Sequence, residues 1–378
     1  MQHVTVYRDP NRYAGWPANY GIWSWGDEIV AGFTLGYPDP KGGFHARDRR
    51  RPFVTMQARS LDGGQSWQVQ EMPCRTPGKR GLSADEHVVP ELRVARAIEQ
   101  GMENAPADCP GGIDFTHPDF ALMCARTGLG AGTVAWFYTS IDRCRTWQGP
   151  WVLPTFGQAG VEARTDYLVS GPGACMLFLT ASKRFTGSPA SGGEGDHVFC
   201  ARTVDGGRTF EYLARVTHDY GDGWTIMPAS ARLSACNQRL PHILVAVRCQ
   251  GAARGSEEEP NWIDLYASED NGATWRYLNR PAANTGRGGN PPTLTRLQDG
   301  RVCLTYGYRD LPYGIRARLS ADGGATWGPE RVLRDDAGCH DLGYPRTVQR
   351  PDGTIVTVYY YNDAPEGERY IAATLWRP

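Results

Sequence analysis

Short apolar segments alternate with polar, glycine-rich turns along most of the chain. Five of these segments have a strand-like pattern and are each followed by a very similar turn: FVTMQAR, TVAWFYT, HVFCAR, IDLYA and IRARL. Runs of this length that are bounded by aspartate and glycine predict β-strands. With 46 Gly and 27 Pro in 378 residues, the pattern predicts a turn-rich β protein with few helices.

The turn after each of these strands is a repeated word of eight residues. The five copies begin at Ser60, Ser140, Thr203, Ser268 and Ser320 and read SLDGGQSW, SIDRCRTW, TVDGGRTF, SEDNGATW and SADGGATW. The aspartate can accept hydrogen bonds from backbone amides two residues on, and the glycine can adopt a positive φ. The starts lie 80, 63, 65 and 52 residues apart, which fits one four-stranded sheet for each copy.

Strand-like segments surround each word, and a sixth set follows without a word of its own. We expect strands at 17–24, 28–34, 52–59, 119–126, 131–139, 163–169, 174–181, 196–202, 225–233, 241–248, 262–267, 291–297, 301–308 and 313–319, and then at YPRTVQ, TIVTVYYYN and RYIAATLW. The last set lacks one strand, which the N-terminal segment 3–7 can supply. The sequence therefore predicts an all-β, six-bladed propeller, closed by its N-terminal strand, as a single domain over 1–378.

Two long insertions, 36–51 and 76–118, interrupt this regular pattern. Long loops in compact domains are often functional, so we expect both around a central pocket.

Charge and composition limit the kinds of partner and compartment that the sequence predicts. A formal net charge of −1 gives no bulk attraction to nucleic acid or to an anionic membrane, and no apolar run approaches the roughly 20 residues of a membrane helix. The first residues, MQHVTVYRDP, lack a basic segment followed by an apolar one. We therefore expect a cytoplasmic protein, or a secreted or periplasmic one if a signal was removed. The ten cysteines form no CxxC pair, which favours buried reduced thiols.

The repeated word is similar to the Asp box, S-x-D-x-G-x-T-W, of the sialidase superfamily of six-bladed propellers. The five copies span most of the chain. The resemblance implies the propeller fold and an exo-acting glycoside hydrolase whose substrate ends in an acidic sugar: sialic acid, a related keto-acid sugar or a uronate. No cofactor is implied, and the sequence does not set the oligomeric state.

The resemblance also implies a nucleophile and anion-binding arginines. Gly343-Tyr344-Pro345 resembles the setting of the sialidase nucleophilic tyrosine, and tyrosine nucleophiles are a recognised exception to the two-carboxylate scheme. Arg248 and Arg316 resemble two of the three sialidase arginines, whose planar guanidinium groups bind a carboxylate through paired hydrogen bonds. Tyr344 can alternatively pack the channel, and each arginine can alternatively make surface ion pairs.

A proton-transfer group is expected in the loop HARDRRRPF at 45–53. The sialidase acid/base aspartate lies in the corresponding loop, so Asp48 is the candidate, and His45 is its rival. The segment WTIMPASARL has no acid where the family has the glutamate that partners its tyrosine. Glu162, from a neighbouring blade, is the candidate substitute. The first family arginine is also missing, because its place reads Gly15-Trp16-Pro17-Ala18.

Three further stretches carry more polar groups than turns need. DFTHPDF supplies His117 and Asp119, EARTDY supplies Arg164 and Asp166, and GRGGNPP supplies Asn290. All five are candidates for substrate binding, with structural hydrogen bonds or a simple turn as the alternatives. No second histidine completes a metal-binding spacing around His117, so we expect no metal.

Two other functions explain part of the same pattern. A polysaccharide lyase would use His117 or His45 with a tyrosine to remove the proton next to a uronate carboxylate, and it would not need the missing glutamate. A non-catalytic glycan-binding propeller would bind through its aromatic residues without turnover, because one fold supports many functions.

Overall fold

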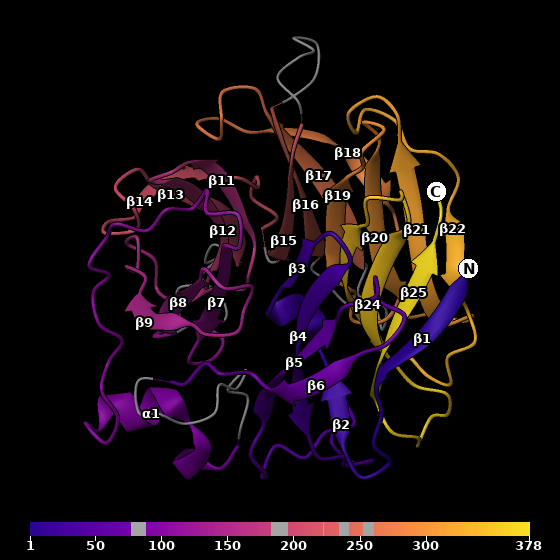
Figure 1. Cartoon of the computed structure of the whole chain (residues 1–378). Helices are drawn as coiled ribbons and strands as arrows, with labels where there is room; N and C mark the ends of the chain where they lie inside the picture. The colour runs from indigo at the N-terminus through magenta and orange to yellow at the C-terminus, as the bar shows by residue number, and fades with distance from the viewer. Residues whose placement is uncertain (77–87, 183–195, 222, 234–241, 252–260) are drawn as a thin grey trace.

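The computed structural model describes residues 1–76, 88–182, 196–221, 223–233, 242–251 and 261–378. Its strands form six small antiparallel sheets arranged in a ring (Figure 1). Blade 1 holds β2 (Tyr13–Gly15), β3 (Ile22–Trp25), β4 (Glu28–Gly36), β5 (Val54–Ser60) and β6 (Gln68–Glu71); blade 2 holds β7 (Ala121–Arg126), β8 (Ala135–Ser140) and β9 (Gln148–Val152). Blade 3 holds β10 (Val161–Glu162), β11 (Tyr167–Gly171), β12 (Ala174–Ala181), β13 (His197–Thr203) and β14 (Glu211–Arg215).

The second half of the ring is more regular. Blade 4 holds β15 (Trp224–Arg232), β16 (Ile243–Gln250), β17 (Asn261–Ser268) and β18 (Arg276–Ala282); blade 5 holds β19 (Pro292–Arg296), β20 (Val302–Tyr308), β21 (Gly314–Ser320) and β22 (Arg331–Arg334). Blade 6 holds β23 (Gly343–Gln349), β24 (Ile355–Tyr361), β25 (Tyr370–Trp376) and β1 (Gln2–Tyr7). The short helices described are η1 (Pro17–Asn19), η2 (Pro90–Leu92) and α1 (Val94–Glu99). The six-bladed, nearly all-β fold is therefore confirmed.

The ring is closed by the N-terminal strand, as predicted. Strand β1 pairs antiparallel with β25, with Gln2 opposite Leu375 and Thr5 opposite Ala372. Val6 on this strand is only 5% exposed and packs into the cluster between blades 6 and 1. Closure therefore joins the two ends of the chain through both backbone pairing and apolar burial.

The first blades depart from the predicted strands. In place of one strand over 17–24, η1 is followed by β3, which begins at Ile22. Pro17 opens η1 because the fixed φ of proline suits the first residue of a helical turn. Trp16, which precedes it, has φ 57°. Two short strands therefore share the inner edge of β4: β2 pairs with its Gly36 end and β3 with its Glu28 end. Blade 2 has three described strands.

Each repeated word forms the hairpin predicted for it. In the third copy, Asp205 accepts hydrogen bonds from the Thr203 hydroxyl (2.9 Å) and from the backbone N–H and hydroxyl of Thr209 (3.0 and 2.6 Å). These donors lower the pKa of Asp205 to about 2. The same pattern recurs at Asp62, Asp142, Asp270 and Asp322.

Strand register divides the ring into two faces. Each of the five words joins the last two strands of its blade, so the words lie together at one face, called the box face. The opposite ends of the same strands form the other face, called the mouth; for example, Trp224 pairs with Gln250 at the mouth while Arg232 pairs with Ile243 at the box face. Insertion 36–51 follows β4 and lies at the mouth, as expected.

Insertion 76–118 does not remain at the mouth. Near its end, the backbone N–H of Ile113 donates to Gly206, within the third word, at 3.1 Å. This part therefore lies at the box face, which corrects the expectation of a pocket loop there. Helix α1 lies at the periphery of the ring (Figure 1), and residues 77–87 lie outside the described part.

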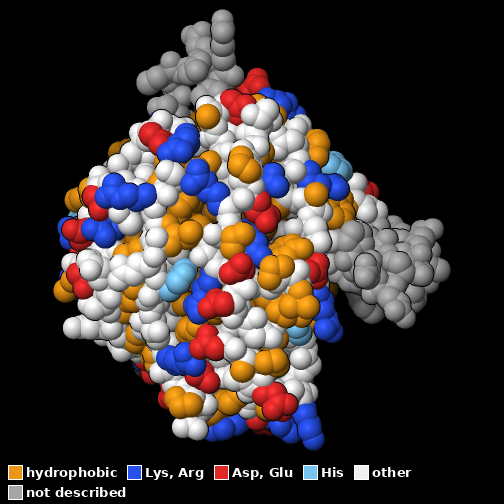
Figure 2. All heavy atoms as spheres, turned by 90° about the vertical axis from the view of Figure 1, so that its right-hand side faces the viewer, with side chains coloured by type: hydrophobic (Ala, Val, Ile, Leu, Met, Phe, Trp, Pro, Cys, Tyr) orange, Lys and Arg blue, Asp and Glu red, His pale blue; other side chains and the backbone are white. Residues whose placement is uncertain are grey.

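Apolar clusters fill the spaces between neighbouring blades. One joins blades 3 and 4 through Phe178, Val198, Val245 and Tyr266, and others join the remaining blades in the same way. The four cysteines in or beside apolar strands are buried and free, as predicted: Cys175, Cys200, Cys249 and Cys303. Among the described helices, none is long and apolar enough to cross a membrane. The face in Figure 2 mixes charges of both signs with scattered apolar side chains.

Candidate functional site

Tyr344 stands at the mouth end of β23 in a backbone conformation that its neighbours enforce. Its φ is 51° and that of Gly343 is 105°, both in the left-handed region. Asn290, which is fully buried, accepts the Tyr344 N–H at 2.8 Å and donates to the Leu342 carbonyl at 3.0 Å. Strained residues held this firmly cluster at functional sites. Asn290 therefore holds Tyr344 in place, and its burial keeps it from the expected contact with sugar hydroxyls.

Arg248 meets the Tyr344 hydroxyl. It lies near the mouth end of β16, and its Nη1 donates to the Tyr344 Oη at 3.2 Å. The guanidinium carbon lies 5.0 Å from the centroid of the Trp224 ring, a cation–π contact. Burial lowers the pKa of Arg248, and its buried Nε has no hydrogen-bond partner in the described structure. The structure therefore brings this arginine to the Tyr344 hydroxyl.

A second arginine in this group is Arg309, which the sequence analysis missed. It follows β20 directly and is 1% exposed, with its guanidinium carbon 5.5 Å from the Tyr344 ring centroid. Its nitrogens donate to the carbonyls of Leu342 and Gly289 and to the Tyr360 hydroxyl, at 2.8–3.1 Å. The signal was available, because Arg309 stands beside the mouth end of the middle strand of blade 5, much as Arg248 does in blade 4.

Arg316, the arginine chosen from the sequence in blade 5, is placed elsewhere. It lies on β21, where Nη1 donates to the Arg334 carbonyl and Nη2 to the Pro312 carbonyl, both at 2.8 Å. Its Nε lies 3.4 Å from Glu330. These partners belong to the outer part of blade 5, and none of the contacts described for Arg316 reaches Tyr344.

His45 is the loop residue that reaches Tyr344. The two rings meet edge to face with centroids 6.4 Å apart. His45 Nδ1 lies 2.6 Å from Asp341 Oδ1, and burial is the largest cause of a lowered His45 pKa. Asp341 also accepts from Tyr360 (2.9 Å), from the Ala46 N–H (3.0 Å) and from Arg369 Nε (3.0 Å). These donors and charges hold the pKa of Asp341 far below its usual range despite burial.

Asp48, the other candidate in this loop, is occupied locally. Its carboxylate accepts from the Arg50 backbone N–H at 2.9 Å and from Arg50 Nε at 3.0 Å, and these bonds lower its pKa. No described contact joins Asp48 to Tyr344. Of the two loop candidates, the structure brings His45 to the tyrosine.

Glu162 and Arg164 line a separate hollow of about 440 Å³ between blades 2, 3 and 4. Glu162 accepts from the Gly130 N–H at 2.9 Å and the Ser182 hydroxyl at 3.3 Å, and it lies 3.6 Å from Arg164 Nη1. Trp224 lines the same hollow and joins it to Arg248 through their cation–π contact. Glu162 thus neighbours the site, but no described contact makes it the partner of Tyr344.

Asp166 lies on the inner wall of blade 3 and is 9% exposed. It accepts from the backbone N–H and hydroxyl of Ser230 at 3.2 and 3.1 Å. Burial raises its pKa to about 7, against the opposing charge of Arg346. Arg346 in turn donates to the carbonyls of Ala18 and Thr165, so this pair ties blades 1, 3 and 6 together.

His117 and Asp119 lie at the box face. They precede β7, whose first residue, Ala121, pairs with Ser140 of the second word. Asp119 accepts from Arg143 Nε at 2.6 Å, and His117 Nδ1 accepts from the Asp119 N–H at 3.2 Å. This placement puts both residues at the opposite face of the ring from Tyr344, bonded within blade 2.

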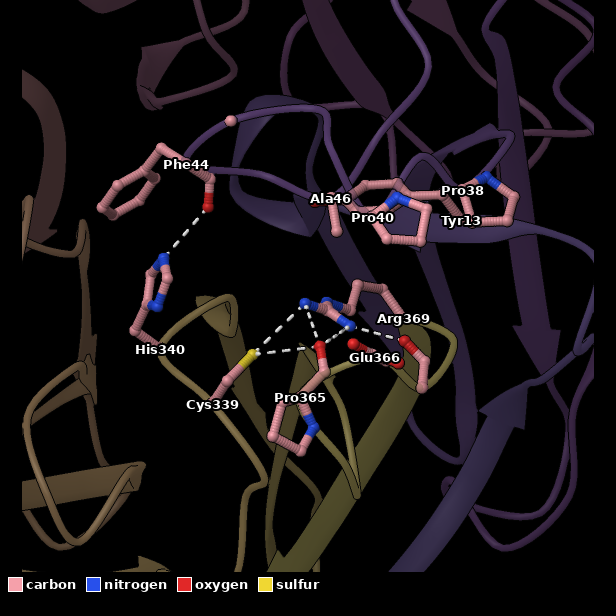
Figure 3. A pocket seen from close by; sticks show the side chains of 12 residues that line it. Tyr13, Pro38, Pro40, Phe44, Ala46, Cys339, His340, Pro365, Glu366 and Arg369 are labelled. Atoms are coloured by element: carbon pink, nitrogen blue, oxygen red, sulfur yellow. Dashed lines mark hydrogen bonds between the residues drawn. The ribbon is translucent and has the colours of Figure 1, made fainter.

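A second hollow, of about 230 Å³, lies between loops of blades 6 and 1, where Cys339, His340 and Arg369 face Phe44 and Pro40 (Figure 3). Arg369 Nη2 lies 3.2 Å from the Cys339 sulfur, and His340 Nε2 lies 3.0 Å from the Phe44 carbonyl oxygen. No group of three or more metal-binding side chains occurs in the described part of the chain.

Comparisons with solved structures agree with this fold. A protein of unknown function from Dyadobacter fermentans is 21% identical, with a TM-score of 0.69 over 99% of this chain and 97% of that one. An α-L-arabinofuranosidase from Fusarium graminearum, solved with an iminosugar inhibitor, is 13% identical, with a TM-score of 0.63 over 100% and 98%. A Trypanosoma rangeli sialidase is 11% identical, with a TM-score of 0.57 over 99% and 58%.

A search of curated proteins found no match. Residues 121–357, more than half of the chain, match the BNR repeat-like domain family. The chain, which carries five Asp-box hairpins in a closed ring of six blades, therefore belongs to the BNR repeat-like domain family.

Proposed function

We propose that the protein is an exo-acting glycoside hydrolase that removes a terminal acidic sugar, either sialic acid or a related keto-acid or uronate sugar. The observation that carries the proposal is the hydrogen bond from Arg248 to the Tyr344 hydroxyl, with Arg309 against the same ring. A tyrosine between two buried arginines supplies both a nucleophile and the charge that an acidic sugar requires.

Tyr344 would attack the anomeric carbon. A neutral phenol approaches a carbon that bears a carboxylate without charge repulsion. As the phenol loses its proton, the N–H of Arg248 at 3.2 Å stabilises the developing phenolate, because a fixed donor in a water-poor site favours the charge that forms there.

Arg248 would bind the sugar carboxylate, and the charge of Arg309 lies behind the same tyrosine ring. Arg248 has a buried Nε without a partner in the described structure, and a guanidinium group binds a carboxylate through planar, paired hydrogen bonds. Burial lowers the pKa of Arg248 because it disfavours the charged guanidinium group. A bound carboxylate would offset that cost by pairing with the buried positive charge.

Similarity to known enzymes supports hydrolysis in general terms. The structures with this fold include the arabinofuranosidase and the sialidase described above. The preference for an acidic sugar rests on the arginines of this chain and not on these distant neighbours.

Mass spectrometry of an acidic glycan mixture incubated with the protein tests the proposal. We expect released sugars that carry one added water, and no release by Tyr344→Phe. A glycan mixture left unchanged across sialylated, keto-acid and uronate substrates would overturn the hydrolase and favour a binding propeller.

A lyase is the second candidate, and one observation favours it. The neutral imidazole of His45 lies against Tyr344, and a histidine base beside a tyrosine and arginines suits proton removal next to a uronate carboxylate. Products with a new double bond and no added water would identify the lyase.

A further inference from the structure

A tyrosine nucleophile needs a base, and His45 is a titratable group whose ring contacts Tyr344. The groups described against Tyr344 are Arg248, Arg309, Tyr360 and His45. The two arginines carry a positive charge and cannot accept a proton. Burial raises the pKa of Tyr360 well above its ordinary value, so that phenol also keeps its proton. Within this set, His45 is the one group that can take a proton at neutral pH.

Three carboxylates described near the mouth already have other partners. Glu162 is bonded to Gly130 and Ser182 and lies beside Arg164. Asp48 is bonded to Arg50. Five groups are bonded to the Asp341 carboxylate in the described structure. These donors and charges keep it ionised with a pKa far below its usual range, so its affinity for another proton is low.

The contact with Asp341 determines which ring nitrogen of His45 carries the proton. Because Asp341 is an ionised acceptor 2.6 Å from Nδ1, the neutral ring holds its proton on Nδ1 and leaves the lone pair on Nε2. Nε2 makes no hydrogen bond within the described structure, and 15% of the His45 side chain is exposed. Asp341 is itself fixed by Arg369 and Tyr360.

We propose that His45 is the base that accepts the Tyr344 proton and that Asp341 is its positioning residue, a role that rests on the proposed hydrolase. As the Tyr344 oxygen bonds to the anomeric carbon, its proton moves to His45 Nε2. The bond to the leaving oxygen breaks, and that oxygen keeps the electron pair and takes a proton from water. In the second step water attacks the anomeric carbon and releases a proton to solvent. The bond to Tyr344 breaks, and His45 returns its proton to the phenolate.

The charges around His45 set the direction of its pH dependence. Burial, Arg309 and Arg47 lower the His45 pKa below 6.5, and Asp341 opposes them. The other groups facing it are Tyr360 at 3.4 Å and the Tyr344 ring, with Arg369 behind Asp341. The neutral form is required, so kcat/KM should rise as pH increases through a pKa below 6.5 and then level off.

Two variants assayed on the hydrolysed glycan test the proposal, with His3→Gln as the matched control because His3 bonds Thr374 far from the mouth. His45→Gln should lower kcat about 100-fold or more and abolish the rising limb. Asp341→Asn should lower kcat about tenfold or more and move the limb to lower pH, because the charge that raises the His45 pKa is gone. A merely structural role would not move that limb.

Nitrogen NMR of the unaltered protein gives a readout that does not depend on the folding of variants. With ¹⁵N-labelled histidine, His45 should be protonated on Nδ1 and not on Nε2 at neutral pH. A neutral His45 protonated on Nε2 would contradict the proposed His45–Asp341 dyad. So would an active His45→Gln protein whose kcat/KM rises with pH as in the wild type. Neither result would contradict the proposed hydrolase activity. If the wild-type protein and its Tyr344→Phe variant are equally inactive on every acidic glycan, the proposed function itself fails.

Discussion

The Tyr360 hydroxyl joins the two charged groups on which the site depends. It accepts from Arg309 Nη2 at 2.8 Å and donates to Asp341 Oδ1 at 2.9 Å, and the side chain is fully buried. Tyr360→Phe removes only this oxygen. The variant therefore tests whether these buried polar bonds stabilise the closed ring.

The size of the effect follows from the partners. A hydrogen bond to a charged group contributes about 1.5–3 kcal/mol. Arg309 and Asp341 keep other partners, so the lower end applies to each bond. Loss of both should lower the free energy of unfolding by about 3 kcal/mol.

Tyr13→Phe is the matched control. Its hydroxyl donates to the same Asp341 oxygen, but at 3.3 Å, and the side chain is 1% exposed. One long bond should contribute about 1 kcal/mol or less. Urea unfolding followed by tryptophan fluorescence measures both variants. If Tyr13→Phe costs as much as Tyr360→Phe, the assignment of stability to the Tyr360 bridge is wrong.

Three further outcomes are expected. Asp205→Ala should lower the free energy of unfolding by about 1 kcal/mol at pH 7, after allowance for solvent screening. The pKa of Asp205 is about 2 in the folded protein against an ordinary 3.8. The stabilisation is therefore complete above pH 3.8 and is lost as pH falls through 2. The unfolding curves of the wild type and of Asp205→Ala should converge at acid pH. Val6→Asp should lower stability by about 3 kcal/mol or more, since a charge would enter a 5%-exposed site in the closing strand; equal denaturation midpoints would contradict closure. Arg309→Lys should raise KM for an acidic glycan more than Arg316→Lys does, and the reverse order would contradict the assignment of Arg309 to the site.

Local sequence was sufficient to predict the Asp-box hairpins and the closure of the ring. The bonds of Asp205 stay within one eight-residue word, so turn chemistry alone determines them. Closure follows from one unpaired edge in blade 6 and one spare strand, β1. The failed strand over 17–24 is also local in origin, because Pro17 begins a helical turn there.

The site was harder to predict because it depends on the direction in which each strand runs and on contacts between residues far apart in the sequence. Strand alternation indicated the face of Arg316 but not that its bonding partners lie at Arg334 and Pro312. The choice between Asp48 and His45 depends on Asp341, which lies 296 residues from His45 in the sequence. Strand direction could have excluded Asp119, since the residues before β7 must lie at the box face when Ala121 pairs with Ser140.

Covalent trapping at Tyr344 tests the central claim most directly. The protein would be incubated with 2,3-difluorinated acidic sugars, whose second step is slow, then digested and mapped by mass spectrometry, with Tyr344→Phe in parallel. The account predicts one sugar attached to the peptide that contains Tyr344, and no adduct in the variant. A sugar attached to another residue, or no adduct in a protein that hydrolyses the parent glycan, would contradict the role of Tyr344 as the nucleophile.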